Sequence, residues 1–384
     1  MQTLDLISLT RKLLSFDTVN PPGNEKPVAL IAGKLLEENG FYVRYIPFET
    51  DRLQVIAERG CNDSVPPVVF TGHFDTVPLG VNSWSVDPFA GEVNGDRLFG
   101  RGASDMKGGL AAMIIAAISA FKEGNPVGGI RLIFTAGEEQ GCHGAERLSY
   151  DNVDLGKARG IIVGEPTSNV PAIGHKGGLY LNLTATGITA HSSMPHLGEN
   201  AIYKIARAIL KAERFDFGVE ADPLLGMPTI NVGKVSGGMN INSVPDRAGF
   251  TIDARTTTKV DHQILLKQLQ QELGNEISID VLVNLKAVSN NENDHFVRHV
   301  YQACGIGQKN EGLPKALPYL TDGSVLQPLL GGAPTVILGP GEPEMAHQTD
   351  EFCYVSKLKE AVKIYKRIIL NDLNEYDISK KNSD

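Results

Sequence analysis

Cysteine is scarce in this chain of 384 residues, which contains only Cys61, Cys142, Cys304 and Cys353. No two of them form a CxxC pair, so the sequence indicates neither a thiolate metal cluster nor a disulfide framework. We therefore expect reduced thiols and a cytoplasmic location.

Long hydrophobic runs are also lacking. The most apolar stretch, residues 110–121, has 12 residues, whereas a helix needs roughly 20 to span a bilayer. Residues 1–14 place Leu and Ile on one helix face but intersperse charges among them, so they do not resemble a secretion signal. We expect an N-terminal helix, a buried helix at 110–121 and no membrane association.

Positive charge is in short supply, because 36 basic against 45 acidic side chains give a formal net charge of -9. A balance of this sign disfavours nucleic acid or an anionic membrane as a partner. Hydrophobic residues make up 42% and charged residues 21%, which is typical of a folded protein. At about 150 residues per domain, the length predicts two or three domains.

The first part of the chain alternates between strand-like and helical segments. Apolar runs at residues 67–71, 129–135 and 160–163 are each followed at once by a polar loop. This rhythm predicts an α/β fold, with helices on the faces of a sheet. Ligand sites in such sheets gather at strand ends, so we expect the three loops to converge.

From about residue 176 the pattern changes. Strand-like alternation at residues 179–186, 229–235, 248–254 and 278–285 is interleaved with helical periodicity at 201–212 and 260–273. This is the order of a ferredoxin-like α+β layer. After residue 290 the α/β pattern returns, with a buried strand at 334–338 and a closing helix at 355–370. We predict an α/β domain in two parts, residues 1–175 and 290–384, an inserted domain at 176–289, and a frayed polar tail at 377–384.

Several side chains able to hold a metal stand in short loops close to glycines: His73, Asp75, Asp105, Glu138, Glu139, Glu165 and His347. Any one of them alone is typical of a cap, a turn or the surface. Together they offer the His nitrogen and carboxylate oxygen that zinc favours. Two His and three carboxylates would hold a pair of ions if one carboxylate bridges them.

A more specific signal comes from five strings: GHFDTVP at residues 72–78, GRGASDMKGG at 100–109, GEE at 137–139, GEPT at 164–167 and AHQ at 346–348. In this order they resemble the signature of the di-zinc amidohydrolase and metallopeptidase family that includes acetylornithine deacetylase, succinyl-diaminopimelate desuccinylase, aminoacylase and carboxypeptidase G. The similarity runs through almost the whole chain. That family has a zinc-binding α/β domain with an inserted ferredoxin-like dimerisation or lid domain, which agrees with the pattern above.

The resemblance implies two zinc ions, which cobalt or manganese can replace. It implies that His73 and Glu165 bind one ion, that Glu139 and His347 bind the other, and that Asp105 bridges them. It also implies a cis peptide bond between Asp105 and Met106. Asp75 resembles the carboxylate that fixes the imidazole of a ligand His, and the alternative for it is a turn cap.

Glu138 needs a separate argument, because neighbouring side chains at a strand end point in different directions. One of the pair Glu138 and Glu139 can bind metal while the other faces the water. We assign Glu138 as the general base, which accepts a proton from the attacking water and delivers it to the departing amine. The alternative is a pair of solvated carboxylates at a helix N-terminus.

The inserted domain carries three further candidates. TAHSS at residues 189–193 resembles the segment whose His191 reaches the active site of the neighbouring subunit, and NINSVP at 240–245 resembles the segment whose Asn242 joins it. This implies a homodimer. Arg255 resembles the residue that holds a substrate carboxylate through two parallel hydrogen bonds. The alternatives are a surface or interface position for His191 and a surface ion pair for Arg255.

These features together predict a zinc-dependent hydrolase that cleaves the amide bond of a small N-acyl amino acid by attack of a metal-bridging water. HKG at residues 175–177 and HSS at 191–193 look like acetylornithine deacetylase. TDGS at 321–324 leans toward succinyl-diaminopimelate desuccinylase and the peptidases, yet Ser324 stands where the desuccinylase pattern has Arg. The alternative is an exopeptidase of the carboxypeptidase or dipeptidase type, acting on a short peptide. A binding protein that had lost the chemistry would lack a ligand or the base, and none is missing.

Overall fold

The computed structural model describes residues 5–62, 64–306 and 316–370, so the predicted polar tail at 377–384 lies outside the described residues. The chain forms two compact units. The first comprises the described parts of Met1–Ile173, Asn290–Lys315 and Thr321–Asp384, and the second comprises Gly174–Ser289 with Ala316–Leu320.

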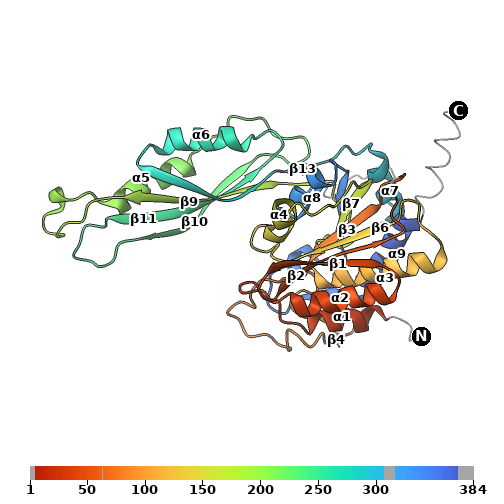
Figure 1. Ribbon diagram of the computed structural model, residues 1–384. Helices are drawn as coiled ribbons and strands as arrows, with labels where there is room; N and C mark the ends of the chain where they lie inside the picture. The colour runs from red at the N-terminus through yellow and green to blue at the C-terminus, as the bar shows by residue number, and fades with distance from the viewer. Residues whose placement is uncertain (1–4, 63, 307–315, 371–384) are drawn as a thin grey trace. The chain divides into compact units, whose positions relative to one another are not determined.

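The first unit is built on a mixed sheet of six strands in the order β1-β2-β6-β3-β7-β14 (Figure 1). The strands β6, β3, β7 and β14 run parallel to one another, whereas β1 and β2 are antiparallel to their neighbours. The central strands β3, β6 and β7 are buried along their whole length, as parallel strands covered on both faces are. The bounds are β1 Tyr42–Glu49, β2 Arg52–Arg59, β3 Val68–His73, β6 Ile130–Thr135, β7 Gly160–Val163 and β14 Thr335–Ile337.

Helices cover this sheet, and α1, α2 and α3 lie together on the side drawn below it in Figure 1. The apolar helix α3 is buried over most of its length and packs against α9. It contains the predicted buried helix at residues 110–121. The bounds are α1 Leu6–Leu14, α2 Lys26–Glu38, α3 Lys107–Glu123, α4 His143–Tyr150, α7 His295–Ala303, α8 Gly323–Leu329 and α9 Val355–Leu370.

A small sheet in the same unit has the order β15-β5-β4 and joins two distant parts of the chain. β5 precedes the Asp105 loop, and its antiparallel partner β15 follows His347. The bounds are β4 Val93–Asn94, β5 Arg97–Phe99 and β15 Phe352–Tyr354, and a short 3-10 turn, η2, covers Pro343–Met345.

The second unit is a four-stranded antiparallel sheet in the order β10-β11-β9-β12, with helices α5 and α6. Chain order and strand order are those of a ferredoxin-like layer. The buried core lies between the sheet and the two helices, and Asn200 and Asp261 cap the helices through side-chain oxygens. The bounds are β9 Gly177–Thr186, α5 Ala201–Glu213, β10 Thr229–Gly237, β11 Arg247–Thr256, α6 His262–Leu273 and β12 Ile277–Leu285, with β8 Gly174–His175, η1 Pro195–Leu197 and β13 Val288–Ser289 as minor elements.

The predicted fold class is confirmed, and the predicted segments at residues 160–163 and 355–370 coincide with β7 and α9. The predicted domain limits remain a prediction. They place all of residues 290–384 in the catalytic domain, whereas the second compact unit also takes in Ala316–Leu320. The reason is that the Leu317 amide donates to the Gly174 carbonyl at 2.9 Å, and the Lys176 amide donates to the Leu317 carbonyl at 3.1 Å. Within the described residues, no helix is both long and apolar enough to cross a membrane.

The second unit also contains a buried His that should make stability depend on pH. Burial lowers the pKa of His175 to about 4, with an opposing effect from the Lys176 carbonyl and a further lowering by Arg255. The unfolded His175 binds a proton below about pH 6.5, whereas the folded one resists protonation down to about pH 4, so stability is lost as the pH falls through that window. We expect wild type to lose about 2 kcal/mol more unfolding free energy than His175→Gln between pH 7 and pH 5. Urea unfolding of both proteins at the two pH values measures this difference, and parallel pH profiles would contradict it.

Candidate metal centre

The predicted convergence of three loops is present. β3 pairs in parallel with both β6 and β7, and His73 at the end of β3 lies level with Thr135 at the end of β6. Because the carboxyl ends of these parallel strands share one edge of the sheet, the loops at residues 72–75, 136–139 and 164–167 meet there. This edge carries the candidate site.

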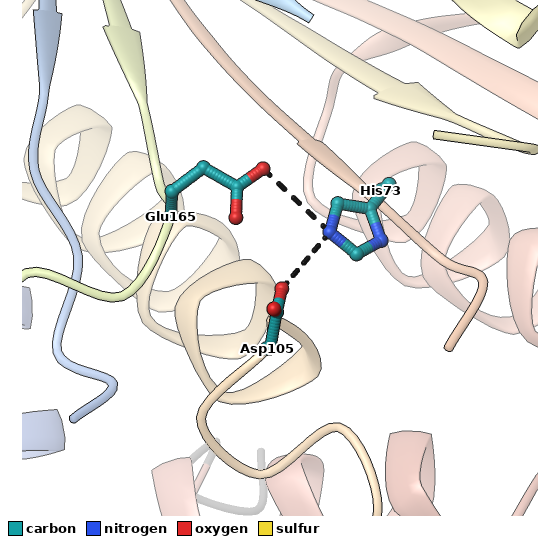
Figure 2. Close-up of side chains that lie close together, drawn as sticks. All are labelled: His73, Asp105 and Glu165. Atoms are coloured by element: carbon teal, nitrogen blue, oxygen red, sulfur yellow. Dashed lines mark hydrogen bonds and ion pairs between the residues drawn. The ribbon is translucent and has the colours of Figure 1, made fainter. Parts of the chain in front are cut away.

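The first group of candidate ligands joins His73, Asp105 and Glu165 (Figure 2). His73 Nε2 lies 3.1 Å from Asp105 Oδ1 and 3.6 Å from Glu165 Oε1. All three residues are buried. Each comes from a different segment: the end of β3, the loop before α3 and the loop after β7.

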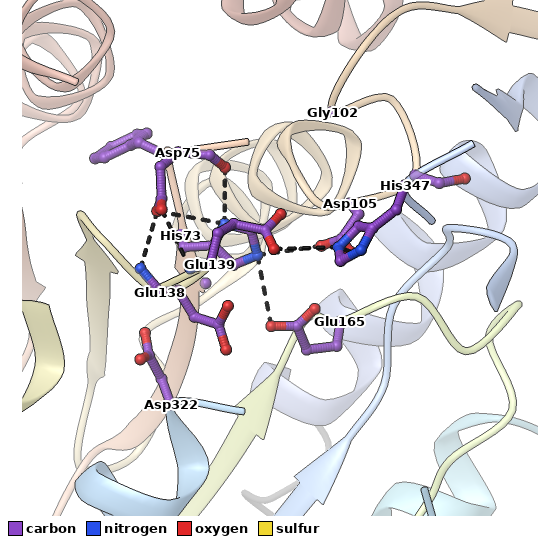
Figure 3. A network of polar contacts seen from close by, with 12 residues as sticks. His73, Asp75, Gly102, Asp105, Glu138, Glu139, Glu165, Asp322 and His347 are labelled. Atoms are coloured by element: carbon purple, nitrogen blue, oxygen red, sulfur yellow. Dashed lines mark hydrogen bonds and ion pairs between the residues drawn. The ribbon is translucent and has the colours of Figure 1, made fainter. Parts of the chain in front are cut away.

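The second group joins Asp105, Glu139 and His347 (Figure 3). His347 Nε2 lies 3.1 Å from Glu139 Oε2 and 3.5 Å from Asp105 Oδ2. Asp105 therefore belongs to both groups and turns one carboxylate oxygen toward each. His347 is exposed, so the second group opens to solvent.

The spacing of these atoms fits metal coordination. Ligands at 2.0–2.2 Å from a tetrahedral ion are about 3.4 Å apart. The four distances from His73 and His347 to their carboxylate neighbours range from 3.1 to 3.6 Å. In addition, Glu139 Oε1 is buried without a hydrogen-bond partner. A cation would give that oxygen a partner.

Negative charge dominates the cluster and shifts its pKa values. Burial and then the charge of Asp105 raise the pKa of Glu165 to about 8. Burial by itself would lower the pKa of His73, but Glu165 and Asp105 outweigh it and raise this pKa well above its usual value. Hydrogen bonds with Asp105 and Glu139 raise the pKa of His347 to about 10. Buried carboxylates that outnumber nearby bases form the charge pattern that divalent cations compensate.

Asp75 connects the parts of the cluster. His73 Nδ1 lies 2.9 Å from the Asp75 main-chain carbonyl and 3.6 Å from the Asp75 carboxylate. Since a carbonyl can only accept, it places the ring proton on Nδ1 and leaves Nε2 to face the other ligands. The carboxylate instead accepts the main-chain N–H groups of Glu138 at 3.1 Å and Glu139 at 3.2 Å. Asp75 thus orients both the imidazole and the turn that carries the two Glu residues.

Glu138 belongs to neither of the two ligand groups that share Asp105. It faces Asp322 (Figure 3), and its Oε1 lies 3.5 Å from Cys142 Sγ. Burial and then the charge of Glu165 raise the pKa of Glu138 well above its usual value. The two Glu residues do not form the alternative arrangement, a pair of solvated carboxylates at a helix N-terminus. Helix α4 begins only at His143, after both of them.

Sequence reasoning overlooked several residues that contact this site. Asn20 Nδ2 donates to Asp75 Oδ2 at 2.9 Å, and Thr135 Oγ1 donates to Asp322 Oδ2 at 2.5 Å. Burial raises the pKa of Asp322 to about 6, although the Thr135 hydrogen bond opposes the shift. The signal for Asp322 in the sequence is its place in the TDGS string at residues 321–324.

The loop that carries Asp105 is tightly packed. Its Asp105–Met106 peptide bond is cis, as the resemblance implies. A Cβ at Gly341 would overlap the Ser104 carbonyl, so only glycine permits this approach of the two loops. Close backbone packing of this kind fixes where the Asp105 side chain starts.

His191 and Asn242, the predicted partners from the inserted domain, come together within the second unit. Both are exposed. The Ser192 amide donates to the Asn242 carbonyl at 3.1 Å, and His191 Nδ1 lies 2.8 Å from Ser193 Oγ. The two predicted segments therefore form one surface.

Arg255 lies within β11 of the same unit and has a local acidic partner. Its Nε is 2.8 Å from Asp253 Oδ1, and its guanidinium lies over the ring of Tyr180 at 5.1 Å. The side chain is one quarter exposed, at 25%. These two contacts restrain the guanidinium and leave part of its surface open to solvent.

A sheet of this topology with two adjoining His and carboxylate groups defines a metal-dependent hydrolase. The chain belongs to the peptidase family M20/M25/M40, which it matches over residues 69–371. This confirms the family resemblance read from the five strings.

Similar proteins span nearly the whole chain. A probable succinyl-diaminopimelate desuccinylase of Staphylococcus aureus is 30% identical, over 96% of this chain and 98% of the relative. A probable carboxypeptidase of Aspergillus clavatus is 32% identical, over 93% and 88%. These relatives agree on hydrolysis and differ in substrate.

Solved structures share the fold. The M20 family metallo-carboxypeptidase of Sulfolobus solfataricus superposes with a TM-score of 0.79 at 20% identity, covering 95% of this chain and 98% of that one. A dinuclear metal binding peptidase of the M20 family from Bacillus subtilis gives 0.70 at 17% identity, covering 96% and 97%.

Proposed function

We propose that the chain is a zinc-dependent hydrolase that cleaves the amide bond of a small N-acyl amino acid. The observation that carries the proposal is the shared Asp105, whose two carboxylate oxygens face two separate groups of His and carboxylate ligands. A structural ion needs only one closed group, whereas a pair of adjoining groups with an exposed side is typical of hydrolytic centres.

In this proposal His73 and Glu165 hold one zinc, Glu139 and His347 hold the other, and Asp105 bridges them. The donor set of imidazole nitrogen and carboxylate oxygen suits zinc, and cobalt or manganese can use the same donors. When bound, the zinc pair supplies a water of lowered pKa and a Lewis acid for the developing oxyanion.

Glu138 is the general base in this proposal. Its carboxylate is left out of both ligand groups, it is 9% exposed at the edge of the cluster, and Asp75 fixes its main chain. From this position it accepts a proton from the attacking water and then delivers that proton to the departing amine. Asp75 orients His73 and Glu138 without touching the substrate.

The inserted unit would bind the substrate. We assign the substrate carboxylate to Arg255, which is pre-oriented by Asp253 and the Tyr180 ring. Asn242 and His191 would complete the site of the partner subunit in a homodimer, with His191 donating to the oxyanion. A cytoplasmic location is part of the same proposal.

A metallo-exopeptidase acting on a short peptide is the second candidate. It is favoured by the similarity to a carboxypeptidase and by Ser324, which replaces the Arg of the desuccinylase pattern. Similarity to a desuccinylase over almost the whole chain favours the acyl amino acid. The two candidates share the centre and differ only in the substrate.

A substrate screen tests the proposal. Zinc-loaded and cobalt-loaded proteins are offered acetylornithine, succinyl-diaminopimelate and a panel of dipeptides. We expect hydrolysis of an acylated amino acid, two bound ions per chain by metal analysis, and loss of activity after chelation. Hydrolysis of dipeptides alone would select the second candidate. Full activity after exhaustive chelation, or a protein that binds no ion, would overturn both.

A further inference from the structure

One buried carboxylate outside both ligand groups is bound entirely to the loop that carries Asp105. Glu351 is fully buried, and its Oε1 accepts the main-chain N–H groups of Ser104 at 2.8 Å and Asp105 at 2.9 Å. Its Oε2 accepts Arg101 Nη1 at 2.7 Å and the Gly102 N–H at 3.0 Å. All four partners donate, and together they span the whole loop from residue 101 to residue 105.

This arrangement is more than a buried ion pair. Burying a carboxylate is costly unless it is paired and hydrogen-bonded, and here one guanidinium and three main-chain amides meet both requirements. Three of the four bonds end on the backbone. They therefore fix the path of the chain and not merely the position of one side chain.

Further contacts join the same two segments. The Gly100 amide donates to the Glu351 carbonyl at 2.9 Å, and Ser104 Oγ donates to the Phe352 carbonyl at 2.7 Å. β5 and β15 pair next to these bonds. The segment at Glu351, four residues after His347, thus holds the loop that presents Asp105.

We infer that Glu351 is a positioning residue of the metal centre, which holds the Asp105 loop where one carboxylate reaches both His73 and His347. This inference rests on the proposed dinuclear function. Asp105 Oδ1 lies 3.1 Å from His73, and Oδ2 lies 3.5 Å from His347. A small displacement of the Asp105 main chain would lengthen at least one of these approaches, so both ions should depend on Glu351.

Glu351→Gln tests this inference. The substitution keeps the size of the side chain but replaces one acceptor oxygen with an NH₂ group, which cannot accept from the two donors now facing it. We expect zinc affinity, measured by competition with a chromophoric chelator, to fall by about tenfold to a hundredfold. Turnover measured at limiting zinc should fall with it and recover in part when zinc is added in excess.

Glu58→Gln is the matched control, because Glu58 and Arg131 form another largely buried ion pair of the same unit, with 2.6 Å between Oε1 and Nε. It should lower stability without changing zinc affinity. Glu351→Asp is a second variant in case the Gln variant does not fold. It keeps the charge but retracts the acceptors by about one bond length, so an intermediate loss of affinity is expected.

Three results would overturn the inference. A folded Glu351→Gln with wild-type zinc affinity would limit Glu351 to a structural role. An equal loss of affinity in Glu58→Gln would attribute the effect to general destabilisation. If wild type itself bound no zinc, the proposed function would fail first, and the inference would fall with it.

Discussion

Turnover by the Glu138→Gln variant is expected to be lower than that of wild type by at least about a hundredfold, with metal content unchanged. Gln keeps the size of the side chain but cannot accept the proton of the attacking water. Because Glu138 stands outside both ligand groups, removing its charge should leave the ions in place. Steady-state kinetics with metal analysis of the same sample measures both quantities.

Glu146→Gln serves as a control, since Glu146 is a carboxylate on α4 close in sequence and stands in none of the candidate ligand groups. It should retain near wild-type turnover, which separates loss of the base from a general change of charge. Substantial turnover in Glu138→Gln would mean that another residue is the base. Loss of an ion in that variant would instead make Glu138 a ligand.

Mixing two inactive variants, Glu138→Gln and His191→Ala, should restore activity if His191 acts on the partner subunit. The premise is a homodimer, which the edge strands of the second unit favour. β10 and β12 end the sheet, and each exposes apolar side chains: Val235 on β10, and Val281 and Leu282 on β12. Natural proteins pair or cover such edges.

The expected recovery follows from the statistics of exchange. With equal amounts and free reassortment, about half of the dimers are mixed, and each mixed dimer has one site with both defects and one with neither, so about a quarter of wild-type activity should return. A mixture of Glu138→Gln with Asp105→Ala is the control. Both residues lie in the first compact unit, so in a mixed dimer each subunit has one defect in its own metal centre and no site is intact. If subunits demonstrably exchange and the first mixture stays inactive, His191 does not act in trans.

Much of the architecture was readable from local pattern. The run at residues 160–163 is apolar throughout and became the fully buried strand β7, whereas residues 179–186 alternate and became β9, which is covered on one face. β1 and β2 were not predicted. The sequence of β1 mixes charged and aromatic residues, and this strand is mostly half-exposed, so no clear period marks it. The sequence of β2 has Arg at both ends and an apolar run of only three residues in the middle, which is a weak strand signal.

For the site, sequence order was sufficient to find the candidate ligands but not their supports. His73, Glu139 and Glu165 follow apolar strands, and the ends of parallel strands meet at one edge whatever the details of the helices. Asn20 carries no such signal, because it follows α1 and no strand of the main sheet. Cys142 lies farther along the loop after β6, directly before α4, and belongs to none of the five strings. Their importance appears only in their contacts with Asp75 and Glu138.

By itself, the sequence determined the family, the order of the elements and the identity of the candidate ligands, because hydrophobic period and short motifs are local properties of the chain. Only the tertiary structure decided which oxygen of Asp105 faces which His, and that the carbonyl of Asp75 is what lies nearest the ring of His73. It also decided that Glu351 binds the loop of Asp105, from which it is separated by 246 residues. Hydrogen bonds of this kind depend on where distant backbones meet, and no local pattern of residues records that meeting.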